Sequence, residues 1–136
     1  MKLLEARHPN RLNAVHPRIV EDLIDLCDTS QRAVDAIVLM IEDLLQFGTD
    51  SRYAIPLQGT PVWELKTRSR GGQKGGARVY WFPITINIKN TAEAFAVLVN
   101  AEAKTGTTLN TNKLEEALEI YLAFKSNPKL MYERSS

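Results

Sequence analysis

The hydrophobic pattern of this chain changes its period twice, and this change limits the folds it can adopt. Apolar residues first recur at helical spacing, in "PRIVEDLIDLC" and then at Val34, Ile37, Val38, Ile41, Leu44 and Leu45. Past Gly59 the spacing becomes two, in "VWELK", "ARVYWFPITINIK" and "EAFAVLVNAEAK". Helical spacing returns in "TNKLEEALEIYLAFK". Periods of 3.6 and 2 indicate amphipathic helices and half-buried strands, so the chain contains both in separate blocks.

The residues between the blocks are typical of element boundaries. Pro17 suits a first helical turn, "DTS" offers N-cap residues, and Gly48 stands where a helix would end. "KLLEA" near the start predicts a short strand, so the expected order is β-α-α-β-β-β-α. We therefore expect one α+β domain over residues 1–136, an antiparallel β-sheet with helices packed on one face.

Alternation along the strands predicts which side chains share a face. We expect the helices to cover one face of the sheet, made of Trp63, Leu65, Val79, Trp81, Val97 and Val99. The opposite face is then open to solvent and presents Glu64, Lys66, Arg68, Arg78, Tyr80, Asn100, Glu102 and Lys104.

Positive charge is concentrated in the hairpin region, although the whole chain carries only +1. The segment from Thr60 to Lys89 holds six Lys or Arg residues and one Glu, which makes it +5 and leaves −4 elsewhere. Such a patch suits phosphate. An ordinary solvated sheet face is the alternative. Arg78 and Tyr80 favour anion binding, because an arginine can hold a phosphate bidentately while a nearby phenol donates a hydrogen bond.

Several other functions find no support in the sequence. The loop "GGQKGG" lacks the Lys-Ser/Thr ending and the following helix of a nucleotide-binding P-loop. The lone Cys27 lies among apolar residues and is expected to be a buried thiol. Two isolated histidines and scattered acids predict neither a metal site nor another cofactor. No apolar run is long enough to cross a bilayer, and the start lacks a signal core, so we expect a cytoplasmic protein.

One stretch, "AIPLQGTPVWELKTRSRGGQKGGARVYWF", resembles the RelE/ParE toxin superfamily, in its phage-derived HigB-like branch. The matching positions are Pro56-Leu57, Gly59, Trp63-Glu64-Leu65 with Lys66, and Arg78-Val79-Tyr80 with Phe82. Lys104-Thr105 matches half of a basic segment of that family, and "NKLEEALEIYLAF" is similar to its final helix. The resemblance covers about Ala54 to Phe124.

This resemblance implies a toxin of a type II toxin–antitoxin system, a ribosome-dependent mRNA endonuclease that needs no metal. A 2′-hydroxyl would attack the adjacent phosphate while cations stabilise the added negative charge. It implies a catalytic set of Arg78, Lys66, Glu64 and Tyr80, with Arg78 as the phosphate clamp. RNA-binding residues would be Arg68, Arg70, Lys74 and Lys104. The implied partners are the ribosome, its mRNA and a cognate antitoxin, expected to be a helix-turn-helix protein.

The chain departs from the family pattern on one strand. Asn100, Glu102 and Ala103 stand where a histidine, an aromatic residue and a lysine are usual. Two alternatives therefore stay open. One is a non-catalytic or degenerate RelE/ParE-fold module, either a gyrase-type poison or a nucleic-acid or ribosome binder. The other is an unrelated small domain with a basic face. On the open-face assumption, Arg78→Ala is expected to remove toxicity and leave the fold intact.

Overall fold

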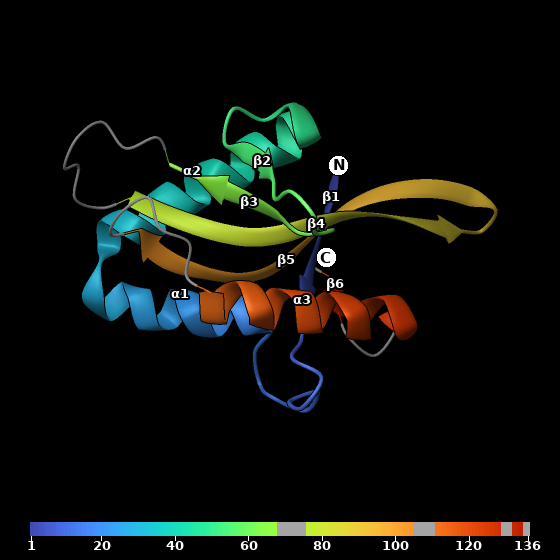
Figure 1. Ribbon diagram of the computed structural model, residues 1–136, viewed down its shortest axis with the longest axis horizontal. Coiled ribbons are helices and arrows are strands. Elements are labelled where there is room, and N and C mark those ends of the chain that lie inside the picture. The colour runs from blue at the N-terminus through green and yellow to red at the C-terminus, as the bar shows by residue number, and fades with distance from the viewer. Residues whose placement is uncertain (68–75, 105–110, 129–131, 135–136) are drawn as a thin grey trace.

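Figure 1 shows the computed structural model of the chain, which describes residues 1–67, 76–104, 111–128 and 132–134. The elements follow one another as β1 (Lys2–Ala6), α1 (Arg18–Thr29), α2 (Gln31–Phe47), a short 3-10 turn η1 (Gly48–Asp50), β2 (Ala54–Pro56), β3 (Trp63–Lys66), β4 (Gly76–Ile88), β5 (Thr91–Lys104), α3 (Thr111–Ser126) and β6 (Tyr132–Arg134). The expected α+β class is confirmed, together with each helix and strand block expected from the periodicity. β2 and β6 were not expected, because three residues are too few to show a period.

The described strands form one sheet in the order β2-β3-β4-β5-β1-β6. Neighbouring strands are antiparallel except β1 and β5, which run parallel from Lys2 beside Phe95 to Glu5 beside Leu98. The sheet is therefore mixed rather than antiparallel throughout. Alternating side chains reveal which residues share a face of a strand, but they carry no information on strand direction.

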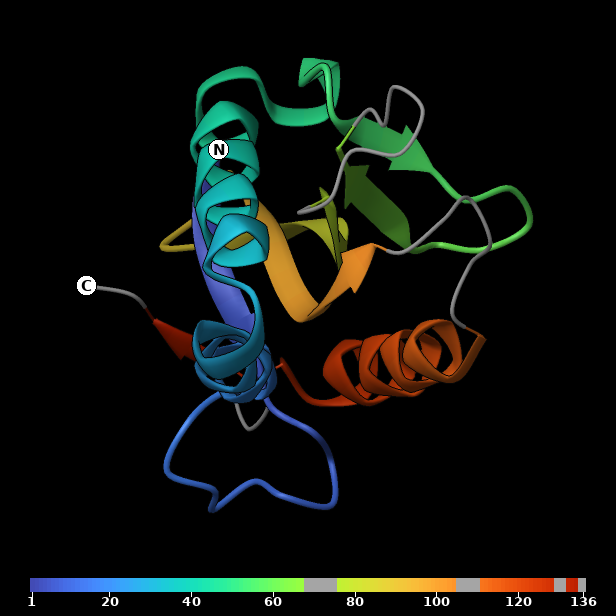
Figure 2. The ribbon, with the colours of Figure 1, turned by 90° about the vertical axis from the view of Figure 1, so that its left-hand side faces the viewer.

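Helices cover both faces of the sheet, whereas the sequence analysis predicted helices on only one face. α1 and α2 pack on one face through a core that includes Ile37, Leu44 and Trp81. α3 packs on the opposite face, where Ile120 and Phe124 join a second core. Figure 2 shows α2 and α3 on opposite sides of the strands. The helical hairpin already occupies the first face, so α3 buries its apolar stripe against the second.

A β-bulge in β5 explains why the expected faces are only partly right. Tyr80 pairs with Asn100, but the next residue, Trp81, pairs with Leu98, so Val99 is the extra residue. Val97 and Val99 therefore lie in the α3 core. Leu98 instead packs with the two helices of the other face.

The tryptophan pair was placed correctly from the sequence. Trp63 and Trp81 share the face of α1 and α2, with ring centroids 5.4 Å apart. Gly48 ends α2 with a φ of 59°, a conformation that suits glycine. Cys27 is exposed, so the expectation of a buried thiol was wrong. It lies on the solvent side of α1, whose apolar stripe packs through Ile19.

Candidate functional site

The four residues of the expected catalytic set meet on two neighbouring strands. β3 pairs with β4 so that Glu64 lies beside Tyr80 and Lys66 beside Arg78. β5 then places Glu102 beside Arg78. Alternate residues of a strand share one face, so these side chains project together on the α3 side of the sheet. We call Glu64, Lys66, Arg78, Tyr80 and Glu102 the strand cluster.

Ion pairs inside the strand cluster hold Arg78 between two carboxylates. Its Nε lies 2.9 Å from Oε2 of Glu64, at an angle outside that of a hydrogen bond, and its Nη1 lies 3.1 Å from Oε1 of Glu102. Nζ of Lys66 lies 3.8 Å from Oε1 of Glu64. Two cations thus face two anions, and the cluster has no excess positive charge.

Burial of this cluster corrects the expected open face. The side chain of Arg78 is 2% exposed and that of Glu64 is 4% exposed, whereas Lys66 keeps 29% of its side-chain surface in solvent. A buried ion costs several kcal/mol of desolvation unless partners compensate it. The two carboxylates supply that compensation for Arg78. Arg78 is therefore part of the packed interior, and the expectation of a solvent-exposed phosphate clamp was wrong.

Tyr80 lies in the same cluster and is fully buried. Its hydroxyl makes no well-aligned hydrogen bond to the described residues. Burial raises the pKa of the Tyr80 phenol above its ordinary value, and the nearby carboxylates of Glu102 and Glu64 raise it further, while Arg78 opposes them. Tyr80 therefore stays protonated at neutral pH. Its ring is not accessible to an RNA base, because no part of it reaches solvent.

One of the four expected RNA-binding residues lies among the described residues, at the end of β5. Lys104 is the last residue of β5, and its backbone pairs with Gly76 of β4. Arg68, Arg70 and Lys74 lie outside the described residues. The expectation that these four residues bind RNA stays a prediction.

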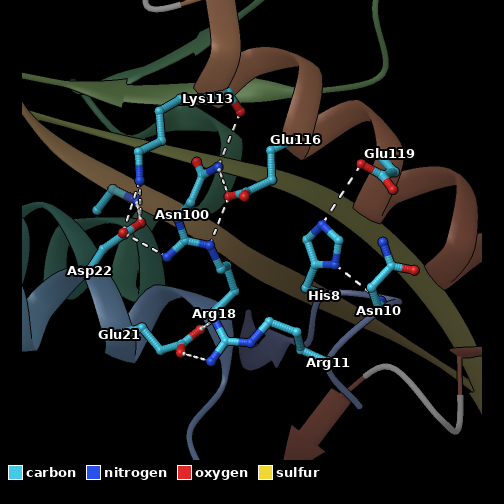
Figure 3. A network of polar contacts seen from close by, with 11 residues as sticks. His8, Asn10, Arg11, Arg18, Glu21, Asp22, Asn100, Lys113, Glu116 and Glu119 are labelled. Atoms are coloured by element: carbon cyan, nitrogen blue, oxygen red, sulfur yellow. Dashed lines mark hydrogen bonds and ion pairs between the residues drawn. The ribbon is translucent and has the colours of Figure 1, made fainter. Parts of the chain in front are cut away.

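A second polar network, drawn in Figure 3, joins α1 to β5 and α3. Both carboxylate oxygens of Asp22 lie 2.8 Å from Nζ of Lys113, and one lies 2.7 Å from Nη1 of Arg18. The other accepts a hydrogen bond from the backbone N–H of Ala101 at 2.9 Å. β1 pairs with β5 only up to Leu98, so Asp22 occupies the edge that β1 leaves open.

Glu116 extends this network along α3. It pairs with Nε of Arg18 at 2.9 Å and accepts a hydrogen bond from the Asn100 amide at 2.8 Å. A cleft of about 370 Å³ opens beside it, between α1, α3 and the connection after β1. His8 on its rim lies 3.8 Å from Glu119, and Arg11 lies 2.6 Å from Glu21. These contacts fasten α3 and the N-terminal connection to α1.

Only one ion pair of this network could be predicted from the sequence. Arg18 and Asp22 are four residues apart on one helix, a spacing that indicates an ion pair. Nothing in the sequence relates Asp22 to Lys113, which lies in a different helix across the sheet edge. Asn100 was expected on an open face; it is fully buried and bonded to α3.

Comparisons of this chain with protein-family models, with curated proteins and with solved structures gave no match. No helix in the described ranges is both long and apolar enough to cross a membrane. In the same ranges, no three His, Cys, Asp or Glu side chains are grouped as metal ligands. The geometry of the strand cluster and the charge of the β3–β4 region therefore provide the basis for a functional proposal.

Proposed function

We propose that this chain is a toxin of the RelE/ParE type that acts by binding the ribosome or its RNA through the β3–β4 region. The observation that supports it most is the pairing of Lys66 with Arg78, because it unites the two halves of the block that resembles the family. The segment from Thr60 to Lys89 also carries +5, a charge that suits phosphate. A cognate antitoxin is its expected partner.

Binding is favoured over cleavage because Arg78 is already engaged. A transition-state clamp needs donors aimed at the position where negative charge develops. Arg78 is 2% exposed and held by Glu64 and Glu102, so a phosphate would first have to displace a carboxylate. Lys66 is the more accessible cation of the cluster.

An mRNA endonuclease of the same fold is the second candidate. It is favoured by the gathering of a carboxylate, two cations and a phenol on adjacent strands, which is a set that could cleave RNA without a metal. In this candidate, binding to the ribosome displaces Glu64 or Glu102 from Arg78.

The first experiment measures pelleting of the protein with 70S ribosomes over a salt series. We expect binding to weaken steeply with salt, because cations released from phosphate drive the association. Lys66→Gln should weaken binding and reduce the salt slope by about one. Lys125→Gln is the matched control, since Lys125 is an exposed cation on α3, outside the β3–β4 region. Binding that ignores salt, or equal behaviour of the two variants, contradicts the proposal.

The second experiment separates the two candidates. Cells express the wild type and Lys66→Gln, and the ends of translated messages are mapped. Growth arrest with intact messages supports the binding mode, and cleaved messages support the endonuclease. Absence of growth arrest by the wild type contradicts both.

A further inference from the structure

The hairpin of β4 and β5 extends beyond the rest of the sheet as a two-stranded arm, which Figure 1 shows reaching past the other strands. β3 pairs with β4 only as far as Trp81, whereas β4 and β5 stay paired up to Ile88 and Thr91. Among the described strands, none pairs with the outer edge of β4 beyond Trp81. Residues 83–88 therefore present an open sheet edge.

The backbone groups on this edge can be assigned from the pairing with β3. Ala77 accepts a hydrogen bond from the N–H of Thr67, so its backbone groups point toward β3. Backbone groups alternate sides along a strand, and the bulge lies in β5, so every second residue of β4 points the same way. Beyond β3 these residues are Pro83, Thr85 and Asn87. Proline is tolerated where an N–H would face an open edge. Thr85 and Asn87 each offer an N–H and a C=O.

The sequence of the edge, Ile-Thr-Ile-Asn-Ile from Ile84 to Ile88, is complementary to itself. In an antiparallel pair centred on Ile86, Thr85 lies opposite Asn87 of the second copy. These two residues exchange both of their N–H···O bonds, and the two-fold axis repeats the exchange. Ile84 then lies opposite Ile88 of the second copy, and Ile86 lies opposite itself. All polar backbone groups of Thr85 and Asn87 are satisfied in this register.

Side chains and charge are compatible with this pairing. The three isoleucines are partly buried against the α3 core, so a second copy continues the same apolar face. Residues 83–88 carry no charge, although open edges are commonly protected by charged side chains. The nearest cation is Lys89 in the turn. In this register the two Lys89 residues lie at opposite ends of the paired segment, about 20 Å apart, so they do not repel strongly.

We propose that the outer edge of β4 is a self-association site, at which two copies of this chain pair antiparallel about Ile86 and join their sheets. The contact involves about five residues per copy, against roughly 20–30 for a standard interface. The dimer is therefore weak and depends on protein concentration. This inference is independent of the proposed action on the ribosome.

Site-specific cross-linking tests the register in a Cys27→Ser background, because Cys27 is exposed. In the proposed dimer, Ile86→Cys brings two Cα atoms to about 4.5 Å, within the range for a disulfide. Ile88→Cys is the matched control, since its two copies lie about 14 Å apart. Diamide accepts the two electrons and two protons of the thiols. We expect Ile86→Cys to give at least about tenfold more disulfide dimer than Ile88→Cys, and equal yields overturn the proposal.

Sedimentation velocity tests the backbone bonds. Thr85→Pro removes the outward N–H and keeps the ladder with β5, as Pro83 does, while Thr85→Val keeps the N–H. We expect the mass of the wild type and of Thr85→Val to rise toward a dimer with concentration, and Thr85→Pro to associate about tenfold or more weakly. A wild type that stays monomeric up to about 1 mM overturns the proposal, as does a Thr85→Pro variant that associates like Thr85→Val. An edge reserved for a strand of another protein would give that monomeric result.

Discussion

Replacing Arg78 by methionine tests whether the strand cluster belongs to the core, and the size of the effect follows from the burial of its partners. Methionine has a similar length and no charge, so the change removes the charge without opening a large cavity. It leaves the carboxylate of Glu64, 4% exposed, without its closest cation. Breaking a buried pair on one side costs about 3–5 kcal/mol. Glu102 is 13% exposed and can turn partly toward water, so it adds less.

We therefore expect Arg78→Met to lower the free energy of unfolding by about 3–4 kcal/mol, measured by urea denaturation with tryptophan fluorescence. Adding Glu64→Gln should restore part of this loss, because the stranded charge is removed, with a coupling of about 1–3 kcal/mol in the double-mutant cycle. Lys125→Met, at an exposed cation, should change stability by less than about 0.5 kcal/mol. The reasoning is refuted if Arg78→Met costs under about 1 kcal/mol or if the two changes are additive. The same measurement shows whether an Arg78 variant that lacks the proposed toxicity is still folded.

Two further changes test the interior. Asp22→Ala should lower the free energy of unfolding by about 3 kcal/mol, because Lys113, Arg18 and a backbone N–H of β5 lose their acceptor. Asp25→Ala, at an exposed position one turn further along α1, is the control and should cost under about 0.5 kcal/mol. Equal effects of the two changes in urea denaturation would contradict the stabilising role of the Asp22 network. Tyr80→Phe should stay within about 1 kcal/mol of the wild type at neutral pH, because the hydroxyl makes no well-aligned bond. Folding raises the pKa of the Tyr80 phenol, so the wild type loses stability relative to Tyr80→Phe as the pH rises above about 10, where the phenol ionises in the unfolded chain. The free energy of unfolding from urea denaturation at about pH 11 should therefore be higher for Tyr80→Phe than for the wild type. A difference between the two proteins that is the same at neutral pH and at about pH 11 would contradict this pKa shift.

Local patterns predicted most of the elements. The α2 helix ends at Gly48, and the strand pieces around Trp63 and Trp81 lie on one face, because caps and alternation depend on neighbouring residues. The face of α2 was rotated slightly from the expected stripe, since Ala33 and Met40 are buried while Val38 is 47% exposed. Such rotations depend on what the helix packs against, which its own sequence does not state.

The sequence predicted which residues meet in the candidate site, but it did not predict that they are buried. Register along β3 and β4 brought Glu64, Lys66, Arg78 and Tyr80 together, as alternation requires. They are buried because α3 packs on the same face of the sheet, and the sequence near these residues does not indicate which face α3 covers. The bulge at Val99 also has no signal in the period, and it displaced two residues from their expected face. Pairings such as Asp22 with Lys113 join residues far apart in the chain and become visible only in the folded structure.

The place of β1 in the sheet has a consequence for synthesis of the chain. β1 is made before the other described strands, yet it lies between β5 and β6, and Lys2 pairs with Phe95. β1 therefore stays without its partner strand until β5 has emerged from the ribosome. The α1–α2 hairpin can assemble early, because its contacts are local. A growing chain is consequently unable to complete its sheet before β5 and β6 are made, and any activity that needs the whole sheet begins only after that point.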